Sequence, residues 1–232
     1  MSIIAIIVAA GRGTRMRSET NKHLLPLAGK PVIAHTLLAF ERSSQVDAIV
    51  LVTSEANRAA YQNIIAKHAI DKVRAIVLGG ETRRDSVYNG LHAARSAALV
   101  LIHDGARPLI AQREIEAVVR DAAKYGAAVV GVPAKDTTIR AREGFIEASL
   151  DRSQLWQLQT PQAFKTTIIM EAHQAAIRDG VQSTDDTGLV RRIGGEVKVT
   201  QGCYANIKVT TPEDLVIAEA LLTQVDAPTA LA

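Results

Sequence analysis

Residues 3–16 read Ile3-Ile4-Ala5-Ile6-Ile7-Val8-Ala9-Ala10-Gly11-Arg12-Gly13-Thr14-Arg15-Met16, an isoleucine-rich run that leads directly into a glycine loop. An unbroken apolar run of this length is typical of a strand that is buried on both faces of a parallel sheet. Gly11 and Gly13 allow backbone amides to approach an anion closely, because they carry no Cβ. Arg15 and Lys22 add positive charge. The segment therefore predicts a polyphosphate site at the end of the first strand.

Two common phosphate loops do not fit this segment. The P-loop requires four residues between its glycines and then Gly-Lys-Ser/Thr, which is absent here. The dinucleotide fingerprint requires a third glycine, where this chain has the bulky Met16, and an acidic residue near position 30, where it has Lys30. An NAD(P)-dependent oxidoreductase is therefore disfavoured, and we expect a site for a mononucleotide triphosphate.

Length and composition favour one α/β domain over residues 1–232, with 47% hydrophobic residues and only 3% aromatic ones. The net charge of +3 is too small to indicate a nucleic-acid partner. Cys203 is the only cysteine, which excludes an internal disulfide and a zinc cage built from cysteines. No apolar run approaches the roughly 20 residues that span a bilayer, and the N-terminus lacks signal-peptide features. We expect a cytoplasmic protein with no membrane partner.

Strand-like and helix-like segments alternate along most of the chain, which is the pattern of a parallel sheet with crossover helices. The strand-like runs cover residues 3–9, 48–53, 73–78, 98–103, 127–132 and 196–201. The segments with helical spacing cover residues 32–42, 55–68, 86–97 and 113–125. Three more helices are expected after Phe164, after a Thr184 cap with Asp185 and Asp186 in the first turn, and from Pro212. The predicted fold class is α/β, with a Rossmann-like, mostly parallel sheet flanked by helices.

The alternation breaks over residues 133–160, where short polar-apolar alternations at 137–140 and 144–148 flank a charged turn at 142–144. This pattern predicts a β-hairpin. An isolated two-stranded hairpin is marginal in water, so it must pack on its own domain or on another subunit. We favour a dimerisation arm that is exchanged across a homodimer.

Three predicted strand ends carry glycine, cation and carboxylate groups, and they are expected at one edge of the sheet because ligands of open α/β sheets bind at the carboxyl ends of strands. These segments are residues 11–13, 79–83 and 103–108. Asp104 could hold Mg²⁺ between nucleotide oxygens or cap the turn that follows. The surrounding motif favours a role in a metal or substrate site.

An ordered series of motifs resembles the 2-C-methyl-D-erythritol 4-phosphate cytidylyltransferase family from residue 2 to about residue 224. The motifs are AAGRGTRM from Ala9, LPLAGKP from Leu25, GGETRRDSVYNGL from Gly79, HDGARP from His103 and NIKVT from Asn206. The resemblance implies a nucleotide-diphospho-sugar transferase type of fold with a protruding β-arm, a homodimer, CTP as donor and a divalent metal, usually Mg²⁺. It also implies attack by the phosphate of the acceptor on the α-phosphorus of CTP, with release of pyrophosphate.

The resemblance assigns roles to individual residues. Arg15 and Lys22 match the catalytic cations, Lys208 matches a lysine that positions the acceptor phosphate, and Arg152 matches an arginine that clamps it from the opposite subunit. The positions that match CTP contacts are Ala9, Ala10, Gly11, Gly13, Gly80, Glu81 and Ser86. The positions that match contacts to the sugar phosphate are Asp104, Arg107, Thr137, Arg152, Thr160 and Lys208. Asp104 is the candidate metal ligand.

Two departures and two alternatives remain. The family commonly has Pro-Lys-Gln where this chain has Asn21-Lys22-His23, so a proline that stiffens the approach to the lysine is missing. Ala205 stands where some members carry an acid, which leaves Asp104 as the better metal candidate.

A ribitol-5-phosphate cytidylyltransferase is the nearest alternative function, and a catalytically silent nucleotide sensor on the same fold is another.

Overall fold

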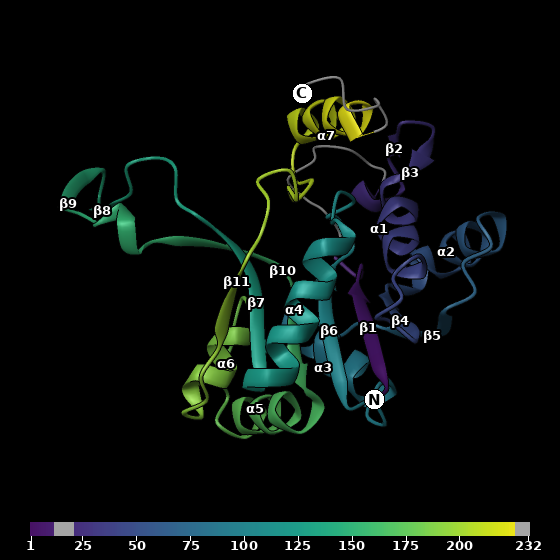
Figure 1. Cartoon of the computed structure of the whole chain (residues 1–232), viewed down its shortest axis with the longest axis horizontal. Coiled ribbons are helices and arrows are strands. Elements are labelled where there is room, and N and C mark those ends of the chain that lie inside the picture. The colour runs from purple at the N-terminus through teal and green to yellow at the C-terminus, as the bar shows by residue number, and fades with distance from the viewer. Residues whose placement is uncertain (12–20, 226–232) are drawn as a thin grey trace.

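A seven-stranded sheet forms the centre of the molecule in the computed structural model, which describes residues 1–11 and 21–225 (Figure 1). The strand order is β11-β7-β10-β6-β1-β4-β5. The strands are β1 (Ile3–Val8), β4 (Ala48–Thr53), β5 (Val73–Leu78), β6 (Leu99–Asp104), β7 (Ala127–Pro133), β10 (Trp156–Lys165) and β11 (Lys198–Gln201). Only β10 runs antiparallel to its neighbours. The predicted α/β class with a mostly parallel sheet is confirmed.

Helices cover both faces of this sheet. They are α1 (Val32–Glu41), α2 (Glu55–Lys67), α3 (Arg83–Ala93), α4 (Gln112–Tyr125), α5 (Thr166–Arg178), α6 (Asp186–Arg192) and α7 (Pro212–Val225). Side chains alternate along β1, so that Ile3, Ala5 and Ile7 join the core beneath α1, α2 and α4, whereas Ile6 joins the core beneath α3, α5 and α6. The first apolar run is therefore buried on both faces, as its composition predicts.

Strand β10 was not predicted, although it lies in the middle of the sheet between β6 and β7. The predicted arm extended to residue 160 and so included the first half of this strand. Glutamines alternate with apolar residues here, and Pro161 removes a backbone donor, which argues against a central strand. The pairing with β7 shifts register between Leu158 and Gln162, so the proline lies at an irregularity in the ladder.

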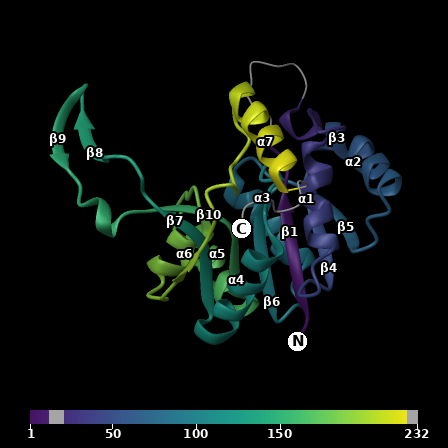
Figure 2. The same ribbon diagram turned by 45° about the horizontal axis from the view of Figure 1, so that its top comes forward.

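The hairpin projects from the body as a protruding β-arm, as predicted (Figures 1 and 2). It consists of β8 (Ile139–Arg142) and β9 (Phe145–Ser149), which among the described residues pair only with each other. Glu143 and Gly144 form the turn with φ of 52° and 87°, conformations typical of a two-residue hairpin loop. Phe145 and Ile146 are 78% and 68% exposed, so the arm has almost no core within this chain.

Small elements complete the chain near the first strand end and the arm. They are the 3-10 helices η2 (Lys22–Leu24) and η3 (Arg152–Gln154) and the short strands β2 (Pro26–Leu27) and β3 (Lys30–Pro31). In the part of the chain that the structure describes, no helix is both long and apolar enough to cross a membrane.

Candidate active site

A cavity of about 650 Å³ opens at the carboxyl ends of β1, β5 and β6, the edge of the sheet that lies toward α7 in Figure 1. It is lined by Val8, Ala10, Gly11, Lys22, His23, Gly80, Glu81, Thr82, Arg83, Ser86, Asp104, Ala106, Lys208 and Thr210. The three strand ends named from the sequence therefore converge. Because seven of these residues come from 80–86 and 104–106, the loops after β5 and β6 form a large part of the wall.

The loop after β5 lies directly against the loop after β1. A Cβ on Gly79 would stand 2.4 Å from Cβ of Ala10 and 2.7 Å from Oγ of Ser86, so only glycine fits there. The N–H of Gly80 donates to Oγ of Ser86 at 3.1 Å, and that hydroxyl donates to the carbonyl of Thr82 at 2.9 Å. These contacts give the loop one conformation at the mouth of the cavity.

Asp104 ends β6 and is surrounded by cations. Nζ of Lys208 lies 2.8 Å from its Oδ2, Nε of Arg107 lies 3.7 Å from the same oxygen, and Nε of Arg83 lies 3.9 Å from Oδ1. Burial alone would raise the pKa of Asp104, but Lys208 and Arg83 outweigh it and hold that pKa well below its usual range. The carboxylate is therefore ionised at neutral pH, and the cations around it outnumber it.

Lys22 lines the cavity from η2, and its Nζ donates to the carbonyl of Val209, next to Lys208, at 3.1 Å. The side chain of Asn21 accepts hydrogen bonds from the backbone N–H of His23 at 3.0 Å and from its ring Nδ1 at 2.8 Å. This cap constrains residues 21–23, the segment in which this chain has Asn21 where the family commonly has a proline. Burial, followed by the charge of Lys22, lowers the pKa of His23 to about 3, so the ring is neutral at neutral pH.

A buried amide supports the segment that carries Lys208. Asn206 is fully buried, and its Nδ2 donates to the carbonyl of Thr160 at 2.9 Å. Nη1 of Arg107 donates to the carbonyl of Asn206 at 2.7 Å, and the N–H of Val209 donates to the carbonyl of Ala106 at 2.8 Å. The segment before α7 is therefore tied to the loop after β6.

His103 is a structural histidine of the loop after β6. It is fully buried, with Nε2 3.1 Å from the carbonyl of Arg107 and Nδ1 3.0 Å from Oγ1 of Thr160. Burial lowers the pKa of His103 to about 4. The ring is neutral and orients the loop after β6.

The candidate residues fall into four groups. The cavity gathers Ala10, Gly11, Lys22, Gly80, Glu81, Ser86, Asp104 and Lys208. Ala9, Arg107 and Thr160 lie behind its wall: the backbone of Ala9 bonds to Val52 and Tyr61, and Oγ1 of Thr160 accepts from the N–H of Asp104 at 3.1 Å. Thr137 and Arg152 are exposed on the arm, away from the cavity of their own chain. Gly13 and Arg15 lie outside the described residues.

Glu81 and Asp104 are the carboxylates that the described residues bring to this cavity. Among residues 1–11 and 21–225, no three His, Cys, Asp or Glu side chains are arranged to hold one. Mg²⁺ commonly takes one or two carboxylates and completes its shell with water and substrate phosphates, which fits Asp104. Lys208 would then have to leave Oδ2, where it now lies.

Sequence reasoning assigned no site role to Thr82 or Thr210 and considered Arg83 only as a brace of the loop after β5; all three line the cavity. Thr82 caps α3: its Oγ1 accepts from the N–H of Asp85 at 3.1 Å, and the carboxylate of Asp85 accepts from the N–H of Thr82 at 3.2 Å. This reciprocal pair was a readable signal, because a capping residue followed three positions later by an acid marks a helix start. The predicted start at residue 86 was therefore wrong by three residues.

Comparison with known proteins agrees with the resemblance. Residues 3–224 match the model of the family described as 2-C-methyl-D-erythritol 4-phosphate cytidylyltransferase. Proteins of that name from Geobacillus kaustophilus and Pelotomaculum thermopropionicum are each 50% identical, over 222 residues (96% of this chain and 97% of the relative) and 223 residues (95% and 94%).

Solved structures give the same result. The 4-diphosphocytidyl-2C-methyl-D-erythritol synthase of Anaerococcus prevotii superposes with a TM-score of 0.84 at 30% identity, covering 96% of this chain and 98% of that one. The 2-C-methyl-D-erythritol 4-phosphate cytidylyltransferase of Thermus thermophilus superposes with a TM-score of 0.78 at 31% identity, covering 94% and 98%. Because the family model matches nearly the whole chain, relatives are 50% identical and the fold is shared, this chain belongs to the 2-C-methyl-D-erythritol 4-phosphate cytidylyltransferase family.

Proposed function

We propose that this chain transfers CMP from CTP to 2-C-methyl-D-erythritol 4-phosphate. An oxygen of the acceptor phosphate forms a bond to the α-phosphorus of CTP, and the bond from that phosphorus to the bridging oxygen breaks to release pyrophosphate. The attacking oxygen is already anionic at neutral pH, so no residue need remove a proton. Catalysis then consists of aligning two anions and stabilising the charge that develops on the phosphorus.

The observation that carries this proposal is the group of cations at the strand ends. Lys22, Arg83 and Lys208 line one cavity together with Asp104, whose carboxylate Arg83 and Lys208 contact. Lys22 would stabilise the charge on the α-phosphorus together with Arg15, and Lys208 would leave Asp104 to bind the acceptor phosphate. Backbone groups of Gly80 and Glu81, with Ser86, would bind the nucleoside, and Gly11 and Gly13 would face the triphosphate.

We assign Mg²⁺ to this site as the cofactor, with Asp104 as its protein ligand. When bound, the ion would neutralise charge on the nucleotide phosphates. Because Lys208 now contacts Oδ2 of Asp104 at 2.8 Å, the movement of this lysine to the acceptor would also clear the carboxylate for the ion. We also propose that the reaction takes place in the cytoplasm.

The arm would complete the site in a homodimer. Thr137 and Arg152 lie on an arm whose apolar side chains are exposed, and Nη1 of Arg152 bonds only to the nearby carbonyl of Lys135 at 2.7 Å among the described residues. A second copy would cover the apolar side chains and receive Arg152 at its acceptor phosphate, where a guanidinium can bind two oxygens. Arg107 and Thr160 would then act from behind the wall, by supporting Asp104.

Pyrophosphate release tests the proposal directly. The purified chain is supplied with CTP and Mg²⁺ and either methylerythritol 4-phosphate or ribitol 5-phosphate, and a reaction without acceptor gives the background. We expect release with methylerythritol 4-phosphate alone. Release with ribitol 5-phosphate alone would contradict the acceptor, and binding of CTP without release in either reaction would indicate a nucleotide sensor.

A further inference from the structure

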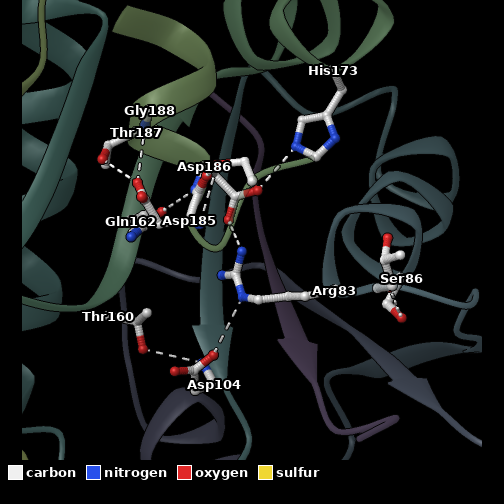
Figure 3. A network of polar contacts seen from close by, with 12 residues as sticks. Arg83, Ser86, Asp104, Thr160, Gln162, His173, Asp185, Asp186, Thr187 and Gly188 are labelled. Carbon is white, nitrogen blue, oxygen red and sulfur yellow. Dashed lines mark hydrogen bonds and ion pairs between the residues drawn. The ribbon is translucent and has the colours of Figure 1, made fainter. Parts of the chain in front are cut away.

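A buried carboxylate lies behind the cavity and connects to it through one arginine (Figure 3). Asp186, the first residue of α6, is 1% exposed, and its Oδ2 accepts from Nη1 of Arg83 at 2.8 Å. Its Oδ1 lies 3.0 Å from Nε2 of His173, a fully buried residue of α5. Because an ionised carboxylate can only accept, the proton of this contact is on Nε2.

Asp186 is held through its backbone, and the histidine that its side chain contacts is itself fixed by packing. Its backbone N–H donates to Oε1 of Gln162 at 3.1 Å, and Gln162 lies on β10 with 2% exposure. The ring of His173 stacks on Tyr88 of α3, with ring centroids 6.0 Å apart and an angle of 11° between the planes. Burial would raise the pKa of Asp186, but the charge of Arg83 and the hydrogen bond with His173 lower it below its usual value.

Arg83 extends from this buried group to the cavity. Its Nη1 is bound to Asp186, and its Nε lies 3.9 Å from Oδ1 of Asp104. Its backbone is fixed as well, because it is the first residue of α3, directly after the cap formed by Thr82 and Asp85. The side chain is therefore held at its backbone and at its far end, with Asp104 beside its middle.

Arg83 and Lys208 differ in how firmly they are held. The Lys208 side chain is 36% exposed and carries a flexible ammonium group, whereas Arg83 is 24% exposed and bound to a carboxylate that is 1% exposed. When Lys208 leaves Asp104 for a substrate phosphate, Arg83 has no comparable freedom to follow. It can keep the carboxylate oriented during that exchange.

We propose that Arg83 is a positioning residue for Asp104, and that the buried pair of Asp186 and His173 acts in the reaction by holding Arg83 in place. This inference rests on the proposed function. A role in stability alone explains the group less well, because well-packed apolar residues often stabilise a core as much as a buried ion pair does. Asp186 binds Arg83 within the core, and Arg83 lies beside Asp104, the carboxylate that faces three cations. The buried charge can therefore act on the site as well as on the fold.

A double-mutant cycle between Asp186→Asn and Arg83→Met tests this coupling. Asp186→Asn keeps the shape and the contact with His173 while removing the charge that binds Arg83. We expect kcat for pyrophosphate release to fall about tenfold, which is about 1.4 kcal/mol in the barrier, with KM for CTP changed less than about threefold. In the Arg83→Met background, the same change should lower kcat by less than about twofold, because its target is already gone.

Asp121→Asn is the matched control. Oδ2 of Asp121 accepts from Oγ1 of Thr200 at 2.7 Å on the opposite face of the sheet, so this variant loses a carboxylate hydrogen bond without touching Arg83. Its kcat should stay within about twofold of the parent. Equal loss from Asp186→Asn in both backgrounds would mean that Asp186 supports only the fold and would overturn the proposal, as would an unchanged kcat in the single variant.

A crystal structure of the Asp186→Asn protein provides a readout that does not depend on activity. We expect the fold and the cavity to be retained and the guanidinium of Arg83 to turn away from Asp104. If Arg83 remains beside Asp104, the positioning role is wrong, even if the parent protein releases pyrophosphate. If the parent releases none while Arg83 turns away in the variant, the proposed function fails and the positioning of Asp104 by Asp186 stands.

Discussion

The cavity and the arm present cationic side chains in opposite ways. In the cavity, Lys208 and Arg83 both contact Asp104. Buried groups hold these two cations in turn: Asn206 supports the segment of Lys208, and Asp186 binds Arg83. On the arm, Arg152 is exposed and the neighbouring apolar side chains face solvent. The cavity is thus organised within a single chain. The exposed side chains of the arm, in contrast, would become buried only against a second copy.

The largest effect should come from the cavity. Lys22→Ala is expected to lower kcat about 100- to 1000-fold, because removal of one preorganised cation or donor has effects of this size. CTP binding should change only a few fold if the contact strengthens mainly in the transition state. Steady-state kinetics and calorimetric titration with CTP separate the two quantities, and an unchanged kcat would remove Lys22 from the mechanism.

Next should come the charged residue of the arm. Arg152→Ala should raise KM for the sugar phosphate about 50-fold, because it removes a charge-assisted contact to the acceptor, and leave KM for CTP nearly unchanged. Initial rates with each substrate varied in turn provide the measurement. Arg140→Ala, on the same arm, is the control, since Arg140 pairs with Glu147 within the hairpin at 3.2 Å. Equal effects on both KM values would contradict the assignment of Arg152.

Self-association should respond to the apolar tip of the arm. Phe145→Ala is expected to weaken the dimer about tenfold, since a large aromatic anchor at an interface contributes at least this much. Sedimentation at a series of concentrations measures the change, and Phe145→Leu is the conservative control. The stability of the isolated chain should not change, because Phe145 is 78% exposed there. A dimer that is insensitive to this substitution would contradict an interface at the arm.

A separate effect, on stability, concerns the buried histidine behind the cavity. The folded pKa of His103, about 4, lies below the value of about 6.5 for the unfolded chain. Its contribution to the free energy of unfolding is therefore complete above pH 6.5 and falls by about 1.4 kcal/mol per pH unit as the pH drops toward 4. Urea unfolding at pH 7 and 5 measures this slope.

His103→Gln should give a shallower pH dependence between those values, and the exposed His92 offers the control variant His92→Gln. No difference in slope between His103→Gln and the parent would mean that the histidine takes up its proton in the folded state. This would weaken the account of the cavity as a region organised by buried neutral and paired groups.

The sequence predicted what local patterns encode. The strands at residues 48–53 and 73–78 appear with the predicted bounds, because an apolar β-branched run bounded by polar residues has few alternatives. The convergence of the strand ends followed from the rule for parallel sheets, and it brought Gly11, Gly80 and Asp104 into one cavity.

What the sequence could not predict depends on pairings between distant residues. β10 was missed because its glutamines and Pro161 mask a strand that the neighbours β6 and β7 stabilise. Asp186 was expected in the first turn of a helix after a Thr184 cap, but Asp185 caps α6 instead and Asp186 pairs with Arg83, 103 residues earlier in the chain. No local pattern indicates such a pair.

Subunit mixing tests the central comparison most directly. Lys22→Ala and Arg152→Ala chains carrying different affinity tags are produced together, and the heterodimer is isolated. If each arm serves the partner's cavity, one site of the heterodimer has both an intact Lys22 and an intact Arg152, and kcat/KM for the sugar phosphate, measured well below its KM, should return to about half of the parent dimer's value. If the heterodimer is no more active than the two variant homodimers, the arm does not act on the partner's cavity, and the account of a site completed by two chains is wrong.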